Sequence, residues 1–260
     1  MKWHRIYGAL LRYIYGFRHS LDRMSDAFFW PLVDLTMWGL TSRYFVSQNI
    51  NNVVLLSLLG GVLLWIFPWR AQYEISVNLL EDLWNRNLVN MFTTPLKFSE
   101  WIVTLMLIGI GKSLLSFSFA SAVAYALYRT NIFVVGWSLL PWAGLLMLFG
   151  WVFGLFVTGL IVRYGTKIQT IAWTSIAIIS PFSAIYYPVS VLPEWAQQIA
   201  GWVPASYVFE AMRGSLAGHP LPLTNLILPT LLCLCYLVVA LIFMYKSFRH
   251  IHNKGLISVD

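Results

Sequence analysis

Two ionisable residues lie inside long apolar segments of the chain, and they are the first candidates for chemistry. Asp34 and Lys112 each fall within a run hydrophobic enough to cross a bilayer. A charge at such a depth is costly unless it meets a partner or a water-filled cavity. At about 1.5 Å of rise per residue, Asp34 lies about 12 Å and Lys112 about 17 Å from the same membrane face. The sequence therefore predicts an intramembrane polar pair that fixes helix packing, lines a transport path or, through Asp34, couples transport to protons.

Other residue types that perform catalysis or bind metals do not gather into a site. The Gly-Lys-Ser tripeptide at 111–113 resembles the end of a phosphate-binding loop, but that motif needs a glycine five residues earlier, where this sequence has Met106. Cys233 and Cys235 are two residues apart and point to different faces of a helix. The five histidines are scattered over loops and tails. We therefore predict no catalytic residue, no metal ligand and no cofactor bound by this chain, and we do not expect an enzyme.

Six long apolar stretches form the framework that must hold the two charges. Hydrophobic residues make up 59% of the chain and charged residues 10%, against about 25% charged residues in an ordinary soluble domain. Windows of about 18 or more apolar residues can cross about 30 Å of hydrocarbon. The predicted spans are 27–45, 52–73, 101–128, 134–161, 168–187 and 223–245. We expect an all-α polytopic membrane protein with one domain over residues 1–260.

The distribution of Lys and Arg orients the predicted spans. Six crossings put both termini on one side, and thirteen of the 17 basic residues fall on that side. Because Lys and Arg accumulate in cytoplasmic loops, both termini are predicted to be cytoplasmic, in the cell (inner or plasma) membrane. The net charge of +7 follows from this topology and from contact with anionic headgroups. It therefore does not indicate nucleic-acid binding.

Two polar segments on the predicted cytoplasmic side have a helical period. Residues 1–26 repeat apolar side chains at steps of three and four, which predicts an amphipathic helix in the membrane interface or, alternatively, an arm packed on the protein itself. Residues 78–96 predict a cytoplasmic helix whose apolar stripe includes Leu80 and Trp84 and which ends at Pro95. Such a helix is suited to a groove on another protein.

The cytoplasmic end of the second predicted span carries charges and aromatic rings. Arg70 and Glu74 lie one helical turn apart and could form a pair. At that depth we expect both side chains to reach back to the interface instead. Trp65, Trp69 and Tyr73 fit the aromatic belt that marks a membrane surface.

A segment between the last two predicted spans contains two short helices. It covers residues 188–215, and Gly201 and Pro204 divide it. Each helix is too short and polar to cross the bilayer, yet too apolar for a free loop. We expect these re-entrant helices to enter the outer leaflet and cap the bundle.

Taken together, these features resemble the permease of ATP-binding-cassette type-2 exporters over nearly the whole chain. The shared features are an interfacial first helix, six spans, a cytoplasmic helix ending Thr-Pro-Leu, and a Pro-x-x-x-Leu-Pro-x-Trp-x-x-x-Ile-Ala block before the last span. The residues that match this block are Pro188, Leu192, Pro193, Trp195, Ile199 and Ala200. The chain departs from the family at the start of the cytoplasmic helix, where residues 78–86 replace a Glu-rich stretch containing Gly-Thr.

The resemblance implies a half-transporter that exports an amphipathic, lipid-like or lipid-linked substrate (a drug, a lipid or a glycan) by alternating access. Its expected partners are two copies of a separate ABC ATPase subunit that binds ATP and Mg, a second permease copy in a homodimer, and membrane lipids. Residues implied to dock the ATPase are Leu80, Glu81, Asp82, Trp84, Arg86, Arg163 and Lys167. The implied external gate consists of Pro193, Trp195 and Trp202. The second and fifth spans would line the path, with Asn78, Trp173, Thr174 and Ser175 as wall residues.

An ion-coupled secondary transporter that uses Asp34 and Lys112 is the alternative class. An intramembrane enzyme would need a convergent set of His, Asp, Glu or Ser side chains, which the predicted spans do not offer. An ATPase with a phosphate loop encoded beside this chain would favour export, and its absence would favour the secondary transporter.

Overall fold

The computed structural model describes residues 1–47, 52–85, 87, 93–219 and 222–254. Within these ranges every regular element is a helix. The five longest are α2 (Leu21–Ser47), α3 (Asn52–Trp84), α5 (Phe98–Tyr128), α6 (Leu139–Tyr164) and α10 (Ile227–Lys254). The shorter ones are α1 (Trp3–His19), α7 (Thr170–Ile179), α8 (Glu194–Gly201) and α9 (Pro204–Leu216). The predicted all-helical class is confirmed for the part of the chain that the structure describes.

Four helical stretches are long and apolar enough to cross a membrane. They are Leu55–Trp84, Phe98–Tyr128, Ile132–Ile168 and Thr224–Arg249. Each has at least the roughly 20 residues that a bilayer crossing requires. The chain thus has the helices of a membrane-embedded protein.

Two of the six predicted spans, which correspond to α2 and α7, are not identified as membrane crossings by length and hydropathy. α2 is 27 residues long, but Asp22, Asp26, Asp34 and Arg43 interrupt its apolar surface. α7 has only 10 residues, and 3₁₀ turns at Ser180–Ser183 follow it. At about 1.5 Å per residue, α7 alone covers about 15 Å, half of a hydrocarbon core.

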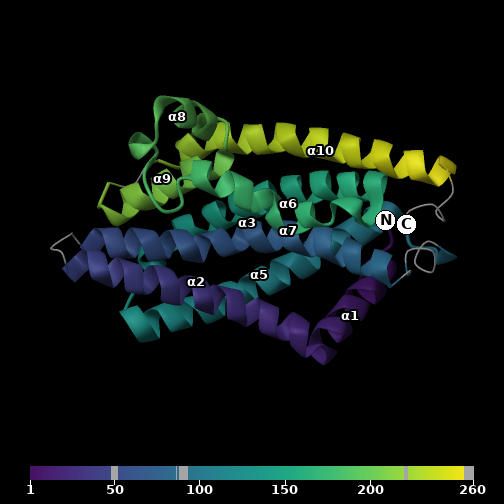
Figure 1. Cartoon of the computed structure of the whole chain (residues 1–260), viewed down its shortest axis with the longest axis horizontal. Coiled ribbons are helices and arrows are strands. Elements are labelled where there is room, and N and C mark those ends of the chain that lie inside the picture. The colour runs from purple at the N-terminus through teal and green to yellow at the C-terminus, as the bar shows by residue number, and fades with distance from the viewer. Residues whose placement is uncertain (48–51, 86, 88–92, 220–221, 255–260) are drawn as a thin grey trace.

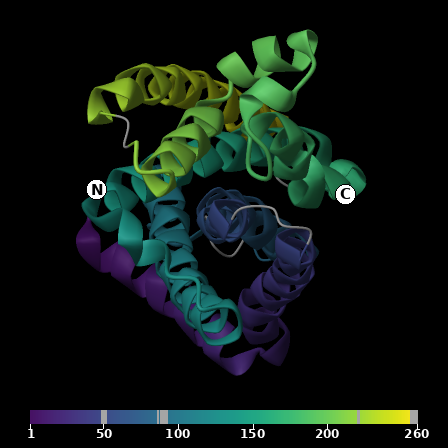
Figure 2. The same cartoon turned by 90° about the vertical axis from the view of Figure 1, so that its left-hand side faces the viewer.

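α3 is the central helix of the bundle. It packs against α2, α5 and α6 (Figures 1 and 2), and 78% of its most apolar window is buried. In α10 the corresponding share is 22%, because this helix packs on α6 with one face and leaves a row of large apolar side chains exposed on the other. In a membrane protein such a face is suited to contact lipid.

Glycine at two positions of α6 brings this helix close to α3. A Cβ atom at Gly150 would lie 2.4 Å from the carbonyl oxygen of Pro68 and 2.6 Å from the Cβ of Ala71. A Cβ atom at Gly154 would lie 3.1 Å from the Cβ of Ile75. Small residues four apart let two helix backbones approach each other, and here they position α3 for the site described below.

The last turns of α3 overlap the segment in which the sequence predicts a separate cytoplasmic helix. The prediction places a span at 52–73 and a new helix at 78–96, but α3 continues without a break to Trp84. Its apolar period persists there, since Leu79 and Leu80 are buried in the same cluster as Trp101 of α5. Residues 86 and 88–92 of the predicted helix lie outside the described residues.

α1 is held on the bundle by carboxylates of α3 and α5. Arg12 and the hydroxyl of Tyr13 both donate to Asp82, the latter at 2.9 Å, and Trp101 Nε1 donates to Tyr13 at 2.9 Å. Burial raises the pKa of the Tyr13 hydroxyl above its ordinary value, so this group remains a donor. The packed alternative therefore holds for one face of α1, while the other face leaves large apolar side chains such as Trp3 exposed.

The two ends of the bundle are formed by different elements. α1 begins and α10 ends at the same end, where Lys2 N donates to Glu100 at 2.7 Å and Phe248 stacks on Phe98. The short helices α8 and α9 lie at the opposite end (Figure 1). Two short helices are present on either side of the Gly201 to Pro204 break, and their predicted re-entry into the outer leaflet stays a prediction.

Candidate functional site

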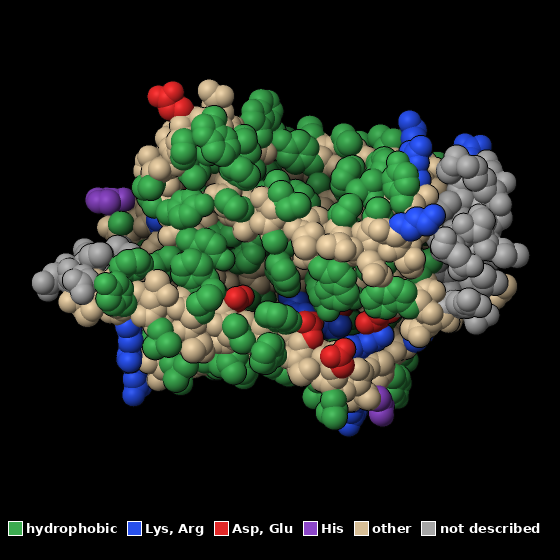
Figure 3. All heavy atoms as spheres, in the orientation of Figure 1, with side chains coloured by type: hydrophobic (Ala, Val, Ile, Leu, Met, Phe, Trp, Pro, Cys, Tyr) green, Lys and Arg blue, Asp and Glu red, His purple; other side chains and the backbone are tan. Residues whose placement is uncertain are grey.

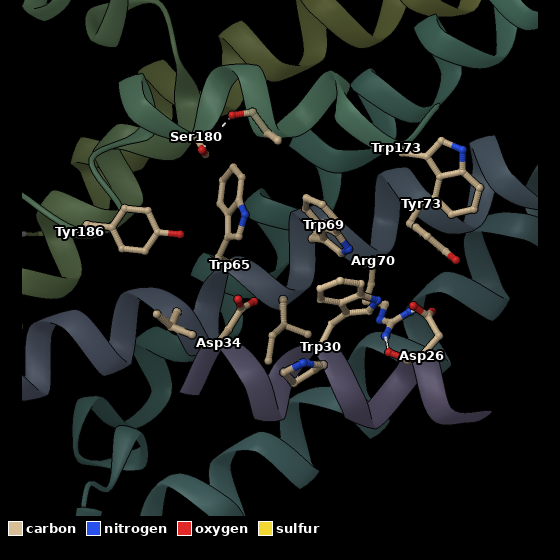
Figure 4. Close-up of a pocket in the computed structure, with 14 residues that line it drawn as sticks. Asp26, Trp30, Asp34, Trp65, Trp69, Arg70, Tyr73, Trp173, Ser180 and Tyr186 are labelled. Atoms are coloured by element: carbon tan, nitrogen blue, oxygen red, sulfur yellow. Dashed lines mark hydrogen bonds and ion pairs between the residues drawn. The ribbon is translucent and has the colours of Figure 1, made fainter. Parts of the chain in front are cut away.

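A cavity of about 480 Å³ lies between α2, α3 and the segment from α7 to Tyr186. Aromatic side chains form the largest group in its walls (Figure 4), and the aromatic residues that line it are Trp30, Trp65, Trp69, Tyr73, Trp173 and Tyr186. The charged residues that line it are Asp26, Asp34 and Arg70. On the surface, acidic and basic side chains appear in a hollow between apolar ones (Figure 3).

Helical periodicity explains why these residues share one cavity. Trp65, Trp69 and Tyr73 follow one another at steps of four along α3, and residues at this spacing lie on one face of a helix. Asp26 and Asp34 flank Trp30 at the same spacing on α2, so two parallel stripes face each other across the cavity. The prediction that the α3 aromatics form a membrane-surface belt is wrong for Trp65, which is only 9% exposed and packs in the core.

Neighbouring rings fix the aromatic walls. Tyr73 meets Trp173 edge to face with ring centroids 5.5 Å apart. Tyr186 stacks on Trp38 of α2 at 4.1 Å. Pairs of this kind add stability beyond the area that they bury. The walls from three separate elements are therefore pre-formed.

Asp34 reaches into the cavity without a bonding partner. In the described part of the chain, its carboxylate forms no hydrogen bond and no ion pair, and its side chain is exposed toward the hollow (Figure 4). The predicted pair of Asp34 with Lys112 is wrong, because Lys112 Nζ lies 2.7 Å from Glu74 Oε2. Similar depth along two helices suggests a pair, but depth does not say which face of its helix each residue occupies. Lys112 faces α3, whereas Asp34 faces the cavity toward α7.

Four charged residues, which we call the buried charge cluster, lie beside the cavity. They are Asp26, Arg70, Glu74 and Lys112. Arg70 Nη1 lies 2.5 Å from Asp26 Oδ2 and 4.0 Å from Glu74 Oε1, so the cluster joins α2, α3 and α5 with two positive and two negative charges. Arg70 is 2% and Glu74 1% exposed. The expectation that they reach back to the interface is therefore wrong, since each has a partner at its own depth.

Residues predicted to dock an ATPase divide into exposed and buried groups. Trp84 is 49% exposed, and Arg163 and Lys167 are exposed where α6 ends, at the same end of the bundle as the end of α3. Leu80 and Asp82 are buried. Their predicted place on a docking surface is contradicted, because Leu80 packs in the core and Asp82 bonds to α1.

Two further predicted docking residues have different outcomes. Glu81 is half-buried and forms an ion pair with Arg23 of α2. Arg86 lies outside the described residues.

The predicted external-gate residues lie around α8. Pro193, Trp195 and Trp202 are all exposed. Trp195 meets Phe182 edge to face at 6.0 Å, so α8 is attached to the turns that follow α7. Their role as a gate stays a prediction.

Among the predicted wall residues, only Trp173 lines the cavity. Asn78 instead donates to Glu74 Oε2 at 3.0 Å and so belongs beside the buried charge cluster. Thr174 donates to the carbonyl of Thr170, within its own helix. The sequence reasoning missed Trp30, Asp26 and Tyr186; the four-residue spacing of Asp26, Trp30 and Asp34 was the signal that could have identified the α2 stripe.

The cavity offers aromatic surface and charge, and its hydroxyl group already has a partner within the chain. In the described residues, no three His, Cys, Asp or Glu side chains gather as metal ligands. Ser180, a hydroxyl at the cavity, donates to the carbonyl of Ala177 at 2.8 Å. The chain matches no protein-family model and no curated protein.

Proposed function

We propose that this chain is the permease subunit of an ATP-driven exporter of the ABC type-2 class, which moves an amphipathic substrate out of the cytoplasm by alternating access. The observation that carries the proposal is the 480 Å³ aromatic cavity with charged residues, situated among helices of membrane-spanning length. Pockets of this size, mostly apolar with a few polar groups, are typical of small-molecule sites. The Pro-x-x-x-Leu-Pro-x-Trp block, which forms the entry to α8, supports the same class.

In this proposal six elements cross the membrane: α2, α3, α5, α6, α10 and the segment from α7 through Ser183. α2 carries charged residues and α7 is short, and both border the cavity, which distinguishes them from the other four elements. A charged surface in contact with hydrocarbon is costly. A second copy of the chain that covers this face would remove Asp26 and Asp34 from lipid, which supports a homodimer with the cavity near its axis.

The proposed contact with the ATPase lies at the end of the bundle that carries Trp84, Arg163 and Lys167. These three side chains are exposed together with many Lys and Arg residues near the ends of α1, α6 and α10. By the excess of basic residues, this end would be cytoplasmic. ATP and Mg would bind to the partner subunit, two copies of which would serve the dimer.

Co-purification tests this proposal. The tagged chain, extracted in mild detergent, is expected to bring down a subunit with a phosphate-binding loop, and Trp84→Ala or Lys167→Glu is expected to reduce its recovery. Trp195→Ala is the matched control, because it removes an exposed Trp from the other end of the bundle. Absence of any ATPase, or equal loss with Trp84→Ala and Trp195→Ala, would contradict the proposal.

A secondary transporter is the second candidate, and the unpartnered carboxylate of Asp34 favours it. Lys112 is engaged by Glu74, so Asp34 would have to couple transport to an ion gradient alone. Uphill transport by the chain without an ATPase would identify this class.

A further inference from the structure

We propose that the cavity between α2, α3 and α7 binds a hydrophobic organic cation, with Asp34 as the counter-charge and the Trp and Tyr rings as the contact surface. The inference rests on the proposed function, because it names the substrate class of that permease. It separates a cationic substrate from the anionic lipids and phosphate-linked glycans that the same class of transporter could carry.

The charge at the cavity favours a cation. Asp26 is neutralised by Arg70, and Glu74 by Lys112, whereas Asp34 has no partner in the described part of the chain. A carboxylate among apolar helices is unfavourable unless a cation or water accompanies it. A bound cation would supply the charge that no residue of the chain supplies.

Arg70 does not oppose such a ligand. Its guanidinium lies 2.5 Å from Asp26 Oδ2 and also donates to the carbonyl oxygen of Asp26. Glu74 Oε1 lies 4.0 Å from Arg70 Nη1. The positive charge is thus directed into the buried charge cluster, and Asp34 determines the net charge of the cavity.

The aromatic lining favours the same ligand. The face of an indole or phenol ring attracts a cation, and Trp does so most strongly. Trp65 and Trp69 of α3 and Trp30 of α2 lie on both sides of the space that Asp34 enters, and Tyr186 points toward it from the segment after α7 (Figure 4). An anion at this position would lie beside the Asp34 carboxylate, which repels it.

The size and rigidity of the cavity suit a compact ligand. Its volume of about 480 Å³ falls within the roughly 300–1,000 Å³ range of drug-sized sites. Tyr73 is held by Trp173 and Tyr186 by Trp38. Walls fixed before binding reduce the entropy lost when the ligand enters.

Two ions of equal shape and opposite charge test the inference. Tetraphenylphosphonium and tetraphenylborate are titrated against the chain in lipid nanodiscs, with tryptophan fluorescence as the signal. We expect saturable binding of the phosphonium, weakened at least about tenfold, or about 1.4 kcal/mol, by Asp34→Asn. Asp34→Glu should retain binding. Asp22→Asn, which removes an exposed carboxylate from the same helix, should leave the affinity unchanged, and it also controls for partition into lipid.

Two results would overturn the inference. One is equal phosphonium affinity in the wild-type chain and Asp34→Asn. The other is saturable tetraphenylborate binding as tight as that of the phosphonium. Because the nanodiscs contain no ATPase, the two proposals fail separately. Charge-selective binding without a co-purified ATPase would refute the exporter and keep the cation site. An associated ATPase without charge-selective binding would refute the cation site and keep the exporter.

Discussion

Glu74 and Asp34 are both carboxylates within the helical bundle, and their surroundings differ in every respect. Glu74 is almost completely buried, accepts from Lys112 and Asn78, and lies near Arg70. Asp34 faces a cavity and, in the described residues, has no bonding partner. The first region matches each charge within the chain, which serves to hold α2, α3 and α5 together. The second leaves the charge of Asp34 unmatched within the described residues, and we propose that a bound cation matches it.

The largest expected effect comes from removing one partner of an ion pair in the buried charge cluster. Lys112→Leu would leave Glu74 buried without its ammonium partner, and breaking a buried pair in this way costs about 3–5 kcal/mol. Unfolding in mixed detergent micelles measures the loss. Glu74→Gln combined with Lys112→Leu should recover much of it, since neither charge then remains. A single variant as stable as wild type would mean that the cluster does not hold the helices.

A smaller effect is expected where α1 contacts α3 and α5 through the hydroxyl of Tyr13. Tyr13→Phe removes a hydroxyl that donates to Asp82 and accepts from Trp101. Removing one partner of a buried hydrogen bond costs about 1–3 kcal/mol. Tyr15→Phe, on the exposed face of α1, should change the free energy of unfolding by less than about 0.5 kcal/mol. Equal effects of the two variants would contradict the distinction.

The smallest effect on stability is expected in the cavity. Asp34→Asn removes a carboxylate without a partner, so the free energy of unfolding should change by no more than about 0.5 kcal/mol. The same unfolding measurement checks this value. A loss as large as that of Lys112→Leu would show that Asp34 is structural and would remove the contrast between the two regions.

The sequence predicted the helices better than it predicted their contacts. Apolar windows located α5 and α10, and Gly201 with Pro204 located the break between α8 and α9. Such features depend on residues close together in the chain. α3 extends past its predicted end because Leu80 finds a buried place against α5, which local hydropathy does not reveal.

The candidate site was only partly predictable. Asp34 and Lys112 were recognisable as unusual because charges are rare in apolar segments. The partner of Lys112 depends on the rotation of α5, which turns Gly109 toward α3 so closely that a Cβ atom there would lie 3.6 Å from the Cβ of Glu74. Trp65 and Trp69 were visible as a stripe, but only the packing of α2 and α7 around α3 makes that stripe a cavity wall.

Transport in sealed vesicles tests the central claim most directly. Vesicles containing the chain and its co-purified ATPase, with ion gradients collapsed by an ionophore, are loaded with ATP on the side that carries Trp84. We predict that tetraphenylphosphonium moves toward the opposite side only while ATP is hydrolysed, and that Asp34→Asn slows it. Uphill movement driven by an ion gradient in vesicles that contain this chain alone would contradict the account.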